Sequence, residues 1–145
     1  MSVLPRSKVR AALLILISLF FLFAGVSHFT NPGFFVSIVP PYLPAHLELV
    51  YLSGVFEILG GLGVLLPATR RWAGWGLIAL LFAVYPANVH MAMHPEPFVA
   101  QGTPLSALYL RLPFQFVFMA LVWWATKPEA LDVRHEPATP ARAAS

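Results

Sequence analysis

The chain contains no cysteine, and only 10% of its 145 residues are charged. Without cysteine it can form no disulfide, thiolate nucleophile or iron–sulfur ligand of its own. Any redox role would therefore need a bound cofactor or a partner subunit. A soluble globular domain has about 25% charged residues. Because 59% of the residues are hydrophobic and the mean hydropathy is +0.75, the composition indicates an integral membrane protein.

Four apolar stretches approach the length of about 20 residues that a transmembrane helix needs. They predict an all-α, integral membrane four-helix bundle with spans at residues 11–29, 47–66, 72–91 and 110–126. The first stretch is about as long as a span and lacks a small-residue cleavage site, so we predict that it is not a signal peptide. We expect one membrane domain over residues 1–127 and a polar, disordered cytoplasmic tail over residues 128–145.

The basic residues predict the orientation in the membrane. Arg111 is the only Lys or Arg that falls on the outer side of a four-span arrangement. The positive-inside rule therefore places both termini in the cytoplasm, in a multi-pass protein of the cell (inner) membrane. This orientation accounts for the net charge of +3, so we expect the lipid bilayer, and no nucleic acid, as a partner.

The two outer loops are rich in proline. Asn31 followed by Pro32 is a pattern typical of a helix start, and it predicts a short interfacial helix at about residues 33–39 of the first outer loop. Three further prolines in that loop end this helix. The second outer loop, residues 94–109, is rich in Pro and Gly.

The outer half of the predicted bundle receives almost all of its polar side chains. Glu57 lies at the centre of the second span, where a charge costs about 2.5 kcal/mol or more. Because successive spans alternate in direction, further polar residues fall in the same half. The candidate ligand-binding residues are His28, Ser53, Glu57, Asn88, Arg111 and Gln115. We predict Arg111 as the partner of Glu57, with Gln115, Asn88 and His28 as hydrogen-bonding neighbours. Glu57 then lies at the floor of a pocket that opens outward.

Each of these residues also has a structural interpretation. Glu57 is either a protonated or locally paired acid that fixes helix register, or a proton-relay or ligand-binding acid. Arg111 is either an interfacial snorkelling residue or a counter-ion or ligand clamp. His90 and His94 have the i,i+4 spacing that suits a metal ion, and His28 with His90 could ligate a haem. No acid or third histidine is evidently placed beside His90 and His94, so we predict no metal site.

The chain resembles the DoxX-like family of small four-span bacterial membrane proteins. The stretches that carry this resemblance are GVSHF at 25–29, IVPP at 38–41, SGVFEILGG at 53–61, YPANVHMA at 85–92 and RLPFQ at 111–115. The resemblance implies a four-helix membrane fold and a link to redox biology, because the family name comes from a membrane subunit associated with a thiosulfate:quinone oxidoreductase. It implies no catalytic mechanism.

Three functions follow from these observations. The first is an accessory subunit of a quinone-linked membrane redox system, with redox partner subunits and a quinone in the outer-half pocket. The second is a transporter or channel-like protein for a small solute, and the third is a structural or assembly subunit with no ligand. Catalysis by the chain alone is not expected, because it offers no thiol, metal constellation or Ser/His/Asp arrangement.

Overall fold

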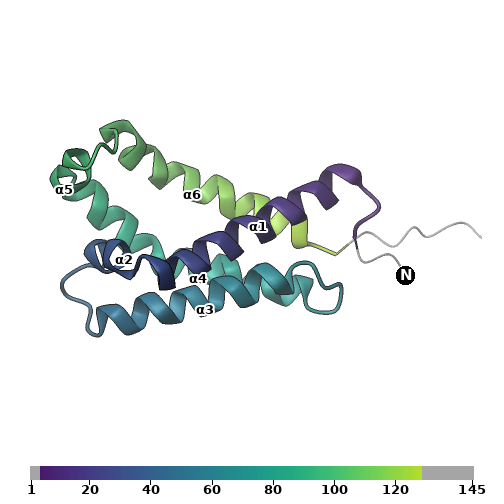
Figure 1. Cartoon of the computed structure of the whole chain (residues 1–145). Coiled ribbons are helices and arrows are strands. Elements are labelled where there is room, and N and C mark those ends of the chain that lie inside the picture. The colour runs from purple at the N-terminus through teal and green to yellow at the C-terminus, as the bar shows by residue number, and fades with distance from the viewer. Residues whose placement is uncertain (1–3, 129–145) are drawn as a thin grey trace, which may run out of the picture.

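The structure, a computed structural model, describes residues 4–128, and every regular element in this part of the chain is a helix (Figure 1). The helices are α1 (Lys8–Thr30), α2 (Pro32–Ile38), α3 (His46–Gly63), α4 (Arg70–Met93), α5 (Glu96–Ala100) and α6 (Leu105–Thr126). The predicted all-α fold is confirmed. The predicted tail lies outside the described residues, apart from Pro128.

Three helices, α1, α4 and α6, are long and apolar enough to cross a membrane. The remaining long helix, α3, coincides with the predicted span at residues 47–66 but is not among these three. It carries Glu48 and Glu57, and it ends in a glycine-rich turn, which lowers its mean hydropathy. The short α2 begins at Pro32, one residue before its predicted start, whereas α5 was not predicted.

The four long helices form a ring. Helix α1 packs against α3 and α6, and α4 packs against the same two helices. The α1–α3 and α4–α6 pairs have the most extensive contacts, so α3 and α6 lie diagonally across the ring. The two pairs diverge toward the end where α5 lies (Figure 1).

An apolar core fills the end of the ring that carries the basic residues. Its buried members are Leu14, Ile17, Phe21, Val64, Leu77, Leu81, Met119, Val122 and Ala125. A second buried cluster lies where the two helix pairs diverge. There Ile38 of α2 packs with Met91, Phe98 and Leu108, which come from α4, α5 and α6. Helix α2 thus fills part of the space between the diverging pairs.

Basic side chains cap helices at the end opposite α5. Arg70 donates from Nε to the Val64 carbonyl at 2.9 Å and from Nη2 to the Leu65 carbonyl at 3.0 Å, just after α3. Arg10 donates from Nε to the carbonyl of Ala125 in the last turn of α6, also at 2.9 Å. These arginines satisfy carbonyls that a helix end leaves unpaired and complement its negative dipole. Arg10 and Arg70 therefore stabilise the C-terminal ends of α6 and α3, and both lie at the end of the ring opposite α5.

Candidate buried polar site

The closest approach of α1 and α3 occurs at two glycines, Gly25 and Gly54. A Cβ atom built on Gly54 would lie 2.9 Å from the Gly25 carbonyl oxygen, and one built on Gly25 would lie 2.8 Å from the Gly54 carbonyl oxygen. Small residues permit this kind of backbone contact between helices in membranes. Each glycine precedes a polar residue by three positions, His28 in α1 and Glu57 in α3. The glycine contact therefore brings these two side chains together.

His28 and Glu57 form a buried contact at 3.2 Å between Nδ1 and Oε2. Their side chains are only 9% and 11% exposed. His28 Nδ1 also lies 2.8 Å from the carbonyl oxygen of Ala24, one turn earlier in α1. A carbonyl only accepts hydrogen bonds, so Nδ1 is the protonated nitrogen of this ring and donates to Ala24.

The Glu57 carboxyl keeps an unsatisfied acceptor. Although Oε2 is within ion-pair distance of His28, it has no hydrogen-bond donor among the described residues. The reason is geometric, because the single Nδ1–H group of His28 points along the Ala24 carbonyl. An unsatisfied buried acceptor costs about 1–3 kcal/mol, and more when it is charged. This carboxyl oxygen is therefore a position where a hydrogen-bond donor would bind favourably.

Helix α2 covers the histidine of this pair. The Phe35 ring stacks on the His28 ring with centroids 3.8 Å apart and planes inclined by 21°. The Asn31–Pro32 helix start turns the chain back immediately after α1, so that α2 contacts α1, α3 and α4. The pair thus lies beneath a short helix and is not directly at the protein surface.

A second polar contact joins α4 and α6. Asn88 donates from Nδ2 to Oε1 of Gln115 at 2.6 Å, and Gln115 donates from Nε2 to the carbonyl oxygen of Leu81. Gln115 is 6% exposed. Both ends of its amide have partners, so this contact is a satisfied bridge between the two helices.

Arg111 and Ser53 do not join the pair at Glu57. Arg111 is an exposed residue whose Nη1 donates to the Met91 sulfur at 3.7 Å, and it makes no ion pair within residues 4–128. Ser53 is half-buried, and its hydroxyl makes no hydrogen bond to this part of the chain. The predicted partnership of Arg111 with Glu57 is therefore not observed. The physical reason is that α6, which carries Arg111, lies diagonally opposite α3.

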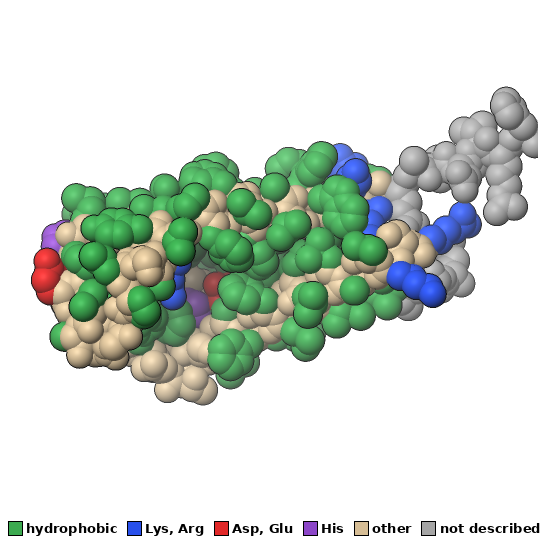
Figure 2. All heavy atoms as spheres, turned by 90° about the horizontal axis from the view of Figure 1, so that it is seen from above, with side chains coloured by type: hydrophobic (Ala, Val, Ile, Leu, Met, Phe, Trp, Pro, Cys, Tyr) green, Lys and Arg blue, Asp and Glu red, His purple; other side chains and the backbone are tan. Residues whose placement is uncertain are grey.

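One face of the protein has a hollow that contains charged side chains. Figure 2 shows a mostly hydrophobic face with a hollow near the middle, in which a Lys or Arg, a His and an acidic side chain are visible. The other charged groups on this face lie toward its two ends. The charged side chains in this hollow are therefore separate from the charged groups at the two ends of this face.

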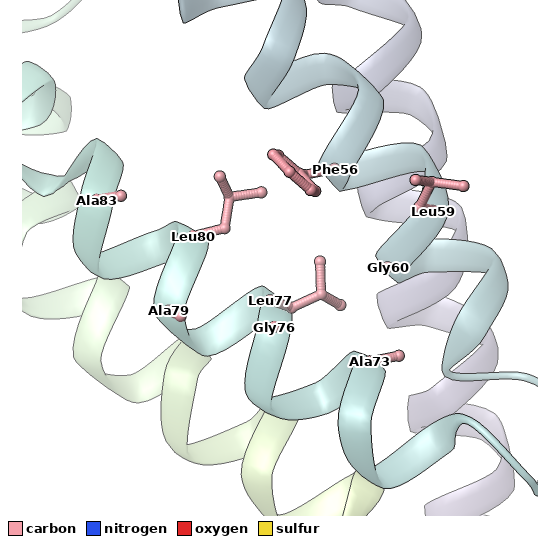
Figure 3. A pocket seen from close by; sticks show the side chains of 9 residues that line it. All are labelled: Phe56, Leu59, Gly60, Ala73, Gly76, Leu77, Ala79, Leu80 and Ala83. Atoms are coloured by element: carbon pink, nitrogen blue, oxygen red, sulfur yellow. The ribbon is translucent and has the colours of Figure 1, made fainter.

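A groove lies between α3 and α4, and its lining includes none of the four residues of the two polar pairs. It has a volume of about 460 Å³ and is lined by Phe56, Leu59, Gly60, Leu77, Leu80 and several small residues of α4. Figure 3 shows its side chains, none of which carries a polar group. The small residues of the second and third spans were noted in the sequence, but this groove was not predicted. Its lining offers no group for chemistry.

The fold and its contacts define a helical protein with candidate membrane spans. Two polar pairs, His28–Glu57 and Asn88–Gln115, lie between its helices. The chain belongs to a family described as a domain of unknown function, DUF8561, whose profile matches residues 17–127. The match runs from within α1 to just beyond α6, so it includes both polar pairs. Comparisons with curated proteins and with solved structures gave no match.

Proposed function

We propose that α3 is a fourth membrane span of a protein in the cell (inner) membrane. In this arrangement both termini lie in the cytoplasm. Two observations support this. Helix α3 packs between α1 and α4, which are both candidate spans, so it would share their depth in the bilayer. The capping arginines Arg10 and Arg70 lie at one end of the ring, as the positive-inside rule requires of a cytoplasmic side.

We propose that this is a DoxX-like accessory subunit of a quinone-linked membrane redox system, and that the outer half of the bundle binds the quinone or quinol head. The observation that carries this proposal is the buried Glu57 carboxyl, whose Oε2 lacks a donor. A quinol hydroxyl is a donor of suitable size, and the apolar surroundings suit its ring and tail. His28 beside the acid would take up a proton that the quinol releases when a redox partner subunit oxidises it.

The buried cores favour this function over transport. A solute passing through the ring would have to cross the apolar core at the basic end, which contains Phe21, Leu77 and Val122 at no more than 1% exposure. The apolar core therefore closes the ring between the two polar pairs and the basic end. A pocket fits this arrangement better than a continuous path.

The test uses the tag-free full-length protein purified in mild detergent. Quinones are extracted and identified by mass spectrometry, and the melting temperature is measured with a short-chain quinol. We expect quinol to raise the melting temperature of the wild type and of Glu48→Gln, a control in the first turn of the same helix. Glu57→Gln should lose most of that shift.

The outcomes separate the proposal from a purely structural role. If no quinone co-purifies and quinol leaves the wild-type melting temperature unchanged, the quinone proposal is wrong. If Glu57→Gln changes the melting temperature without ligand and quinol has no effect on either protein, the polar pair acts only as a structural contact.

A further inference from the structure

A second groove lies apart from the Glu57 site, between the proline segment after α2 and the outer half of α4. Its volume is about 500 Å³. Its lining includes Pro41, Tyr42, Tyr85, His90, Met93 and His94. None of the residues that line it is an acid, a lysine or an arginine. The groove therefore offers neutral nitrogen, oxygen and sulfur atoms to a ligand.

Three of these residues lie at the C-terminal end of α4, where His90 and Met93 are helical and His94 is the C-cap residue. His90, Met93 and His94 have i, i+3 and i+4 spacing, which places their side chains over the same turn. Met93 is 70% exposed, and its unbranched thioether side chain adapts easily in direction. The methionine supplies the third ligand that two histidines alone lack.

The two imidazole rings lie side by side. Their ring centroids are 4.4 Å apart, with planes inclined by 38°. Two imidazole nitrogens on one metal ion, each at about 2.0–2.1 Å from it, are separated by roughly 3 Å. The two rings are therefore near enough for side-chain rotation to bring one nitrogen of each ring to a shared ion.

One histidine is held in the form that ligates metals. His94 Nδ1 lies 3.1 Å from the carbonyl oxygen of His90. Since the carbonyl only accepts, Nδ1 carries the proton and Nε2 keeps its lone pair. An N–H donated to a backbone carbonyl is the usual outer contact of a metal-bound imidazole.

We propose that His90, Met93 and His94 form a binding site for a copper ion, in the Cu(I) state. Thioether and imidazole donors select copper, whereas carboxylate-rich sites favour harder divalent ions. A neutral ligand set also suits a monovalent ion in an apolar groove, because less charge has to be removed from water. This site is separate from the quinone site and does not depend on it.

The experiment measures Cu(I) affinity without any affinity tag that contains histidine. The full-length protein in detergent competes for Cu(I) with the chromogenic chelator bicinchoninate under anaerobic, reducing conditions. We expect one Cu(I) per chain and at least tenfold weaker binding in His90→Ala, His94→Ala and Met93→Leu. His46→Ala, which lies at the start of α3, is the matched control and should bind as the wild type does.

X-ray absorption spectroscopy of the copper-loaded protein provides an independent readout. The wild type should show nitrogen and sulfur neighbours, and Met93→Leu should lose the sulfur contribution while circular dichroism shows an unchanged fold. The proposal is overturned if the wild type binds Cu(I) no better than the His90→Ala/His94→Ala double variant. It is also overturned if Met93→Leu retains both the sulfur signal and the affinity.

Discussion

Gly54→Ala tests whether the close contact of α1 and α3 builds the buried polar pair. The new methyl group would lie 2.8 Å from the His28 Cβ atom and 2.9 Å from the Gly25 carbonyl oxygen. Neither atom belongs to the flexible end of a side chain. The two helices would therefore have to move apart by roughly 0.7 Å to restore ordinary carbon–carbon separations of about 3.5 Å.

The expected loss of stability follows from overpacking. Inserting a methyl group into a well-packed contact costs about 1–3 kcal/mol. The higher helix propensity of alanine opposes this loss by at most about 1 kcal/mol. We therefore expect a net destabilisation of about 1–2 kcal/mol. The separation should also lengthen the contact between His28 and Glu57, so quinol should bind more weakly.

Gly76→Ala is the matched control for this prediction. Gly76 also lies inside a long helix, but a Cβ atom there would meet nothing within 4 Å. Unfolding of both variants in mixed detergent micelles, followed by far-ultraviolet circular dichroism as the SDS fraction rises, gives the two changes in unfolding free energy. Equal stability of Gly54→Ala and Gly76→Ala would refute the reasoning.

Two further substitutions test the other contacts by the same unfolding assay. Gln115→Leu should cost about 1 kcal/mol, because it leaves the Asn88 amide without its partner between α4 and α6. Gln101→Leu, in an exposed loop, should cost much less, and a similar loss in both would contradict a specific bridge. Arg70→Ala should cost about 1–2 kcal/mol, because the carbonyls after α3 lose their donor and its charge. The exposed neighbour Arg71 is the control, and equal losses from Arg70→Ala and Arg71→Ala would mean that net charge, and not capping, is responsible.

The long helices were largely predictable because each is a mainly apolar stretch with only a few polar residues or prolines inside it. The start of α2 was also predictable, since Asn31 and Pro32 form a local signal that needs no tertiary contact. Helix α5 was missed for the opposite reason. Its sequence, EPFVA, is too short to show helical periodicity and stands among prolines and glycines. Burial of Phe98 against α2, α4 and α6 helps to hold it.

The sequence assigned the candidate site residues to one half of the bundle, but it did not predict which of them contact each other. Alternating span directions place Glu57, Gln115 and Arg111 in one half of the bundle. Depth says nothing about which helices are neighbours, and the ring order separates α3 from α6. His28 was predicted as a neighbour of Glu57 but not as its direct partner. The signal that would have paired them is the glycine three positions before each residue, Gly25 before His28 and Gly54 before Glu57. Recognising it requires knowing that α1 and α3 pack together.

The burial of Glu57 depends on two contacts that lie on opposite sides of the pair. Gly25 and Gly54 let α1 and α3 approach so closely that no side chain separates His28 from the acid. Phe35 then covers the histidine from α2, a helix that also contacts α4 and packs into the cluster at the diverging end of the ring. Because α2 contacts α1, α3 and α4, we expect a widening of the gap between the helix pairs to move Phe35 as well. Exposure of the acid and separation of the helix pairs are therefore linked through this one short helix.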